Sequence, residues 1–215
     1  PELKRPIVLT EQGDLYFRRY YQYELSLAQN LWLKSNLKGP VPSKMALGLI
    51  EQHLGSSPDQ LDAAIKSISH KIALITGGPG TGKTFMVITM LAALLIDFPD
   101  LKICLCAPTG KAAHRLSESI IENLKLLNLS SEQLSAFPKE ASTIHRLLRP
   151  LPPSIHFRRN EKTQLEFDLL IVDEASMVDL PLMSKLVQAL PETSRLLLIG
   201  DIDQLAPVEA GAPYH

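Results

Sequence analysis

The sequence of 215 residues has no apolar run near the roughly 20 residues that cross a bilayer. Its start also lacks the charged, apolar and small-residue order of a signal peptide. We therefore expect no membrane partner and, by default, a cytoplasmic location. The chain opens on Pro1 rather than Met and stops at His215, so we expect it to be a segment of a longer protein.

Cysteine is scarce. Cys104 and Cys106, in LKICLCAP, are the two in the chain, and their spacing fits neither a CxxC redox pair nor a zinc site. On a strand, residues two apart point to the same face. We expect two buried, reduced thiols.

An excess of charge of one sign is also absent. The formal net charge is −1 and the pI is about 6.7, so the chain as a whole does not attract nucleic acid. Basic residues cluster only between Lys139 and Lys162, and either a solvated loop or a phosphate-binding track explains that stretch. Any DNA contact is therefore expected to be local.

With 45% hydrophobic residues, the sequence can build one sizeable core plus a smaller appendage. Residues 6–20 predict a hairpin, and residues 21–37 an amphipathic helix whose apolar residues are Leu25, Ala28, Leu31, Trp32 and Leu33. Two more helices are predicted over 44–54 and 58–68. We expect residues 1–55 to form an N-terminal region with a possible subunit contact, and 56–215 to form the main domain.

From Lys71 onward, short apolar runs alternate with helical segments; the runs are IALIT, KICLCA, DLLIVD and RLLLIG. Continuous apolar strands between helices predict an α/β fold with a parallel sheet covered by helices on both faces. Residues 128–167 interrupt this rhythm with a long insertion that includes a short helix near 143–148.

The segment Gly77-Gly78-Pro79-Gly80-Thr81-Gly82-Lys83-Thr84 follows the first of these strands and matches GxxxxGK[ST] in full. The glycines let backbone N–H groups wrap closely around a polyphosphate. Lys83 supplies a charge for the β and γ phosphates, and Thr84 a hydroxyl for Mg²⁺. The pattern therefore predicts a P-loop that binds a nucleotide with Mg²⁺, and Phe85 completes the predicted binding segment.

Asp173 and Glu174 follow the apolar strand DLLIV, where α/β sheets place their ligands. One carboxylate there can hold the Mg²⁺ shell and the other can orient or deprotonate the attacking water. A charge pair that only stabilises a helix start is the alternative. Gln204, in GDIDQL after the last strand, is positioned to touch a γ-phosphate, although GDxxQ alone is an ordinary turn signal.

Together, GGPGTGKT, DEAS and GDIDQL resemble motifs I, II and III of superfamily 1 helicases, and APTGKAA resembles motif Ia. Gln60 stands where that superfamily has an adenine-reading glutamine. GDIDQL differs from the SAT of superfamily 2. Within superfamily 1 the sequence resembles the RecD family, the alpha subunits of exodeoxyribonuclease V (RecBCD), through LITGGPGTGKT, CAPTGKAAHRLSES, STIHRLL, LLIVDEASMVDLPLMSKLV and GDIDQLAPVEAGA.

This resemblance implies a RecA-like motor domain of an ATP-driven 5′ to 3′ translocase on single-stranded DNA. It implies RecB-like and RecC-like partner subunits and a part in double-strand break repair and degradation of linear DNA. Gln60 and the P-loop residues would bind ATP, Thr84 and Asp173 would hold Mg²⁺, and Lys83, Glu174 and Gln204 would serve catalysis. Thr109, Gly110, Lys111 and His145 would contact DNA; for Thr109–Lys111 an ordinary capped helix is the alternative.

The 215 residues contain no counterpart of motifs IV, V and VI, which in this family belong to a second motor domain with an arginine finger. We therefore expect this segment alone to bind nucleotide but to hydrolyse it slowly. Three alternatives remain open at this stage: a stand-alone RecD-like helicase or conjugative relaxase helicase, a non-motor P-loop phosphotransferase, and a mainly binding role in which residues 1–70 dock a partner.

Overall fold

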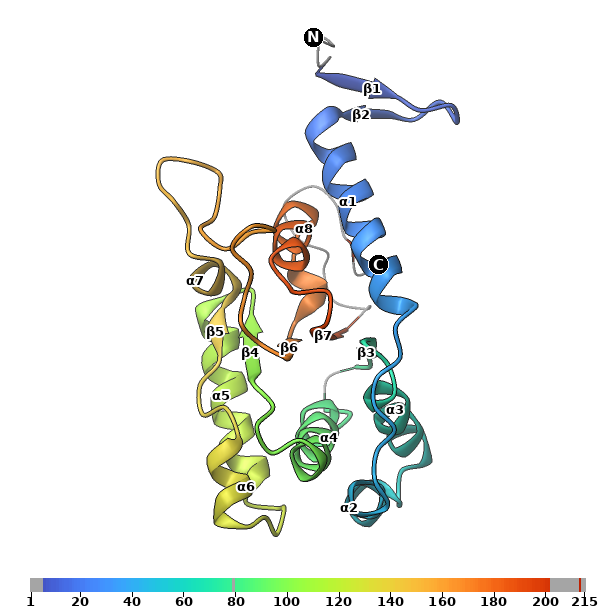
Figure 1. The fold of residues 1–215 in the computed structure, drawn as a ribbon, viewed down its shortest axis with the longest axis vertical. Coiled ribbons are helices and arrows are strands. Elements are labelled where there is room, and N and C mark those ends of the chain that lie inside the picture. Colours follow the sequence, from blue (N-terminus) through green and yellow to red (C-terminus); the bar gives the residue numbers. More distant parts are fainter. Residues whose placement is uncertain (1–5, 79, 202–212, 214–215) are drawn as a thin grey trace.

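The computed structural model describes residues 6–78, 80–201 and 213 (Figure 1). Its N-terminal part is an antiparallel hairpin of β1 (Ile7–Leu9) and β2 (Leu15–Phe17), followed by α1 (Arg18–Ser35). Gly13, with φ +94°, turns the chain between the two strands. The predicted hairpin and first helix are confirmed, with α1 beginning three residues before the predicted start.

The predicted apolar face of α1 is wrong in part. Leu27 is buried and Leu31 packs beside it, but Trp32 is 67% exposed, and Leu25 and Leu33 are exposed too. The helix turns Tyr20, Tyr23, Leu27 and Leu31 toward α8, because these positions recur at the three- and four-residue spacing that stacks on one helix face. The aromatic residues therefore divide: Tyr20 and Tyr23 pack inward, and Trp32 faces outward.

A five-stranded sheet forms the centre of the molecule. Its strands are β3 (Ile72–Thr76), β4 (Ile103–Ala107), β5 (Ser142–Thr143), β6 (Leu169–Val172) and β7 (Arg195–Gly200). They lie in the order β3-β7-β6-β4-β5, and all neighbouring pairs are parallel. The predicted parallel sheet is confirmed.

Helices cover both faces of this sheet, as predicted, giving three layers (Figure 1). One face carries α2 (Lys44–Leu54), α3 (Pro58–Ile68), α4 (Lys83–Asp97) and α5 (Gly110–Leu124), and the other carries α1, α7 (Ile144–Leu148) and α8 (Leu180–Gln188). Strand residues alternate between the layers: Ile171 and Leu197 face α4, whereas Leu170 and Leu198 face α8.

The two cysteines follow the same alternation. Cys104 and Cys106 both lie on β4, both face the layer of α8, and both are buried free thiols. Burial raises the pKa of Cys104 to about 12, and it raises the pKa of Cys106 well above its ordinary value. The sequence-based prediction for this pair is confirmed.

The insertion between residues 128 and 167 contains the predicted short helix, α7, and antiparallel bridges that join Pro150 to Phe157 and Asn160 to Thr163. It also contains α6 (Ser131–Ala136), which the sequence analysis did not predict. The Ser130 and Gln133 side chains cap its start reciprocally. A serine followed by glutamine three residues later was the available signal.

The predicted domain boundary at residue 55 stays a prediction. Ile50 and Leu54 of α2, from the predicted N-terminal region, share a buried cluster with Leu91 of α4 in the main domain. Helix α1 packs instead on α8 at the opposite face, where Gln188 donates a hydrogen bond of 2.7 Å to the Ser26 hydroxyl. Within the described ranges, no helix combines the length and apolar character needed to span a bilayer.

Candidate nucleotide site

The sheet topology gathers the sequence motifs at one edge. Since all five strands run in parallel, the segments after β3, β4, β5, β6 and β7 all emerge at their carboxyl ends. The P-loop follows β3, Asp173 follows β6, and β7 lies between those two strands. The edge is therefore where the predicted ligand-binding residues come together.

The P-loop needs glycine at two positions in particular. Gly80 has φ +75° and Gly82 has φ +78°, a backbone region that residues with a Cβ rarely adopt. Gly77 is close-packed for another reason, because a Cβ there would lie 3.1 Å from the Thr81 hydroxyl oxygen. Pro79 lies outside the described residues.

Polar contacts hold the loop in a compact ring. The Lys83 ammonium donates to the Gly77 carbonyl and, at 2.7 Å, to the Gly78 carbonyl. The Thr81 hydroxyl donates to the Gly78 carbonyl at 2.9 Å. Lys83 is therefore drawn into the ring, with its charge at the centre of the loop.

Gln60 reaches the same loop from α3. Its side-chain amide donates to the Thr81 carbonyl at 2.7 Å, and the amide nitrogen would lie 3.0 Å from a Cβ placed on Gly82. The structure thus brings Gln60 to the P-loop, although 17 residues separate Gln60 from Gly77 in the sequence. The close approach gives Gly82 a second reason to lack a side chain.

Helix α4 starts at the end of the loop. Its N-cap residue is Gly82, and no side chain caps it, so the first-turn N–H groups face the loop without a side-chain partner. Such a helix start favours an anion. Phe85, in the first turn, instead turns its ring toward His53, with ring centroids 6.2 Å apart, and packs on the core.

Thr84, in the first turn of α4, and Asp173, after β6, lie near one another in the fold. Both border the same small internal cavity of about 10 Å³, whose other walls are apolar core residues of α4, α5 and the sheet. Burial raises the pKa of Asp173, while its backbone hydrogen bond at Glu174 and the nearby Lys83 charge act in the opposite direction. Lys83, Thr84 and Asp173 therefore belong to one site on one side of the sheet edge.

Glu174 has an unusual backbone. Its φ is +50°, in the left-handed region that non-glycine residues seldom occupy. This conformation starts a short 3₁₀ turn, η1 (Ala175–Met177), and the Met177 N–H donates to the Glu174 carbonyl at 3.0 Å. The chain therefore turns directly after Asp173, and the Glu174 charge remains near enough to raise the pKa of Asp173.

The sequence analysis did not select Asp201 as a candidate site residue, although the structure places it at the same edge of the sheet. It follows β7 directly, it is only 3% exposed, and its strand lies between those of the P-loop and of Asp173. A carboxylate inside GDIDQL at a strand end was the available signal. Gln204, the predicted γ-phosphate contact, lies outside the described residues.

The predicted DNA-contacting residues lie at the same edge, beyond β6. Thr109 follows β4 and caps α5, accepting a hydrogen bond of 3.1 Å from the Ala112 N–H, while Lys111 in the first turn is exposed. His145 follows β5 and is also exposed, with its ring centroid 5.8 Å from that of Phe157. Thr109 thus forms the ordinary helix cap that was the alternative, and the Lys111 side chain is still exposed at the surface.

The donor set limits which metal could bind. In the described part of the chain, no three His, Cys, Asp or Glu side chains gather in a metal-ligand arrangement. Thr84 and Asp173, which are neighbours at this end of the sheet, offer one hydroxyl and one carboxylate. Mg²⁺ fits such a set, because it is commonly held by one or two carboxylates together with substrate phosphates.

Comparison with known proteins identifies the family to which the chain belongs. Residues 60–210 match a family model described as an AAA domain. This range contains the P-loop, Asp173, Glu174 and Gln204, and a P-loop in such a family indicates that a nucleotide is used.

Several curated relatives share the name RecD. The RecBCD enzyme subunit RecD of Haemophilus influenzae is 41% identical over 213 residues, covering 93% of this chain and 33% of that protein. The subunit of the same name from Mycolicibacterium smegmatis is 39% identical, covering 99% of this chain and 39% of its own. The ATP-dependent RecD2 DNA helicase of Deinococcus radiodurans is 42% identical over 173 residues, covering 80% of this chain and 20% of its own.

The chain thus spans between a third and two fifths of the length of those two RecD relatives. The family match covers well over half of the chain and coincides with the sheet and loop described above. The chain therefore belongs to the AAA domain family, and within that family it is a relative of RecD subunits.

Proposed function

We propose that this chain binds ATP with Mg²⁺ in the loop between β3 and α4. The observation that carries the proposal is the proximity of Lys83, Thr84 and Asp173 at one edge of the sheet, where the Lys83 charge acts on the Asp173 carboxyl and Thr84 is a neighbour of Asp173. The start of α4 has no side-chain cap, so its first-turn N–H groups can donate to phosphate oxygens. Gln60, held against Thr81, is placed to contact a base beside the loop.

Each residue then has a distinct role in phosphoanhydride hydrolysis. Lys83 exchanges its loop carbonyls for the β and γ phosphate oxygens, and Thr84 and Asp173 hold the metal. Mg²⁺, when bound, neutralises charge that builds on the phosphates. Glu174 orients the attacking water and accepts its proton, and Gln204 senses the γ-phosphate. Glu174 follows Asp173 directly and adopts a left-handed backbone conformation there.

We propose further that the chain is the first motor domain of an ATP-driven 5′ to 3′ translocase on single-stranded DNA. The P-loop follows β3 and Asp173 follows β6, with β7 between these two strands. The candidate DNA residues Lys111 and His145 follow the adjoining β4 and β5. A nucleotide-driven movement at one part of the edge is thereby next to the surface that would carry DNA phosphates. Thr109–Lys111 supply N–H groups at a helix start and one free lysine for that contact.

A RecD-type subunit working with RecB-like and RecC-like chains is the assembly that the comparisons favour. Two matches to RecD subunits cover 93% and 99% of the chain, so both include α1 and the second includes the N-terminal hairpin as well. The match to the RecD2 helicase covers 80%. By its relatives, the whole protein would act in double-strand break repair and degradation of linear DNA. Neither a phosphotransferase nor a relaxase helicase is among the relatives described above.

Tailed duplexes test this function in the full-length parent protein, with and without RecB-like and RecC-like subunits. We expect ATP-dependent strand separation from a 5′ single-stranded tail and none from a 3′ tail. Lys83→Ala should abolish it, whereas Lys66→Ala, which removes only an exposed ion pair with Asp62, should not. Unwinding from 3′ tails, or transfer of phosphate to an acceptor metabolite in place of unwinding, would overturn the proposal.

A further inference from the structure

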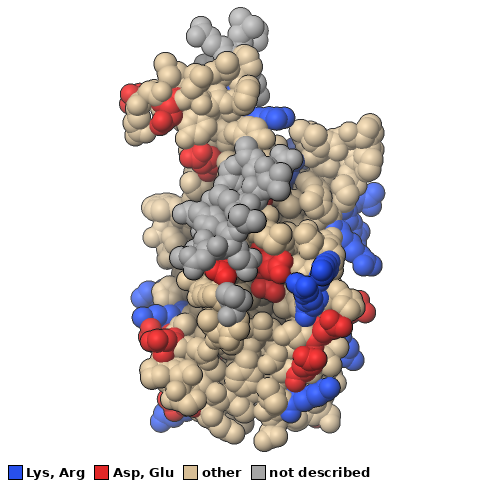
Figure 2. All heavy atoms as spheres, turned by 180° about the vertical axis from the view of Figure 1, so that it is seen from behind, with Lys and Arg blue, Asp and Glu red and all other residues tan. Residues whose placement is uncertain are grey.

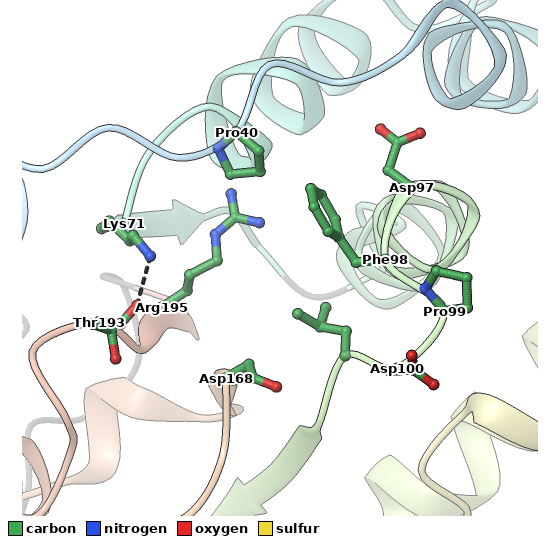
Figure 3. A pocket seen from close by; sticks show the side chains of 10 residues that line it. Pro40, Lys71, Asp97, Phe98, Pro99, Asp100, Asp168, Thr193 and Arg195 are labelled. Carbon is green, nitrogen blue, oxygen red and sulfur yellow. Dashed lines mark hydrogen bonds between the residues drawn. The ribbon is translucent and has the colours of Figure 1, made fainter.

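The amino-terminal edge of the sheet, opposite the nucleotide site, contains a cavity of about 610 Å³. Its walls come from the residues that precede or open β3, β6 and β7, from the end of α4, and from the segment before α2 (Figure 3). Pro40, Phe98, Pro99 and Leu101 supply apolar surface. This volume lies within the range of small-molecule sites, and no role at the nucleotide site uses these residues.

A buried guanidinium faces this cavity. Arg195 is 6% exposed, and Figure 3 shows its guanidinium extending between Lys71 and Phe98. One of its terminal nitrogens donates to the carbonyls of Ile68 and His70. Among the described residues, no carboxylate lies within ion-pair distance of Arg195. Burial lowers its pKa to about 10, as expected for a cation without a neutralising partner.

Lys71 brings a second positive charge to the same cavity. Its ammonium donates to the Thr193 carbonyl at 2.5 Å, and the described part of the chain shows no ion pair for it. Burial lowers the pKa of Lys71 and the charge of Arg195 lowers it further, while the nearby Asp168 carboxylate acts in the opposite direction. Two cations that repel one another beside an apolar wall favour an anion between them.

The cavity also contains carboxylates, and they restrict which anion fits. Asp168 accepts a hydrogen bond of 2.9 Å from the Lys102 N–H, and Asp97 accepts one of 2.8 Å from the Ser43 N–H. Both are engaged by backbone groups and do not form ion pairs with Arg195 or Lys71. With Asp100 they surround the rest of the cavity with negative charge. A polyanion would be repelled, whereas a single carboxylate placed at the two cations would not.

We propose that this cavity is a second ligand site, which binds a small monocarboxylate with an apolar body. The planar carboxylate pairs with the free edge of the Arg195 guanidinium and with Lys71, and the apolar part lies against Phe98 and Pro99. The site is independent of the proposed nucleotide site, since the two lie at opposite ends of the strands.

Titration with benzoate tests the proposal on the 215-residue chain, with the Arg195 Nε–H signal followed by NMR and with heat measured by calorimetry. For a ligand of this size we expect saturable binding with a Kd on the order of millimolar. Lys71→Gln and Phe98→Ala should each weaken it at least about tenfold, the loss expected from one charged or aromatic contact. Lys38→Gln, at an exposed lysine outside the cavity, is the matched control and should bind as the wild type does.

Phenylphosphate and benzylamine complete the experiment, because they keep the ring and change the charged group. Both should bind more weakly than benzoate. The proposal is overturned by any of three results: no saturable shift with benzoate in the wild type, equal benzoate affinity in folded Lys71→Gln and Phe98→Ala, or phenylphosphate binding as tightly as benzoate. Circular dichroism establishes that each variant is folded before it is compared.

Discussion

At the scale of single residues, Glu174 combines an uncommon backbone with a proposed chemical role. A non-glycine residue at φ +50° carries a strain of roughly 1–3 kcal/mol that the surrounding structure must hold. Such strain often occurs at functional sites. Sequence alone predicted the acidic pair from its place after a strand, but not this conformation, because a glutamate gives no signal for the left-handed region.

Glu174→Gln should separate binding from hydrolysis. The amide keeps the size of the side chain but cannot accept a proton, so nucleotide affinity should stay the same while ATP turnover by the full-length parent falls about 10²- to 10⁴-fold. Phosphate release and fluorescent nucleotide binding measure the two quantities. Glu118→Gln, on the exposed face of α5, is the control. Turnover unchanged in Glu174→Gln would remove this residue from the proposed chemistry.

The two cysteines provide a prediction about pH. With a pKa of about 12, about one Cys104 thiol in ten thousand is ionised at pH 8, and burial also raises the pKa of Cys106 well above its ordinary value. Iodoacetamide should therefore label the native chain very slowly at pH 8 and label both thiols readily in urea. The folded pKa of Cys104 lies above the unfolded value of about 9. The contribution of this thiol to the free energy of unfolding is therefore fully present below pH 9 and is lost as the pH rises toward 12. Rapid labelling of the native chain would contradict the burial of β4.

At the scale of elements, the turn of residues 191–194 between α8 and β7 is held by two lysines. Lys34, on α1 and 3% exposed, donates to the carbonyls of Pro191, Glu192 and Ser194 at 2.6, 3.2 and 3.0 Å. The Lys71 ammonium donates to the Thr193 carbonyl, the remaining carbonyl of this turn. The buried lysine thus anchors helix α1 to the turn before the strand that leads to Asp201.

Lys34→Met should break this anchor while keeping most of the apolar stem. Three carbonyls would lose a charged donor, and we expect the free energy of unfolding to fall by about 2–4 kcal/mol. Urea unfolding followed by Trp32, the single tryptophan and a residue of α1, measures the loss. Lys38→Met, at an exposed position, should change stability little. Equal midpoints for the two variants would show that the three contacts contribute nothing.

Elements differed in how well the sequence predicted them. The helices at 44–54 and 58–68 agree with prediction, because Ser43 and Pro58 mark their starts. The inward face of α1 was predicted incorrectly, since apolar residues surround the helix and only packing on α8 selects among them. Helix α6 was overlooked because its six residues carry little periodicity. Local signals predicted where elements begin, and tertiary contacts decided which faces they bury.

At the scale of the whole molecule, the strand order was beyond sequence reasoning. Strand β7 is the last of the described strands but pairs between β3 and β6, and its pairing with β3 joins Ile72 to Leu196, 124 positions apart in the sequence. The carboxyl-edge location of the site was predictable, because parallel strands place every following loop at the same edge. On the face shown in Figure 2, acidic and basic side chains alternate with large uncharged areas, consistent with a net charge of −1.

The central claim is that Lys83 and Asp173 form one nucleotide site with its magnesium ion. Titration of the chain with a fluorescent ATP analogue, with and without Mg²⁺, tests this most directly. Lys83→Ala should weaken binding about 10- to 100-fold, and Asp173→Asn should remove most of the dependence on Mg²⁺, while Lys66→Ala matches the wild type. Wild-type affinity and wild-type magnesium dependence in both site variants would contradict the account.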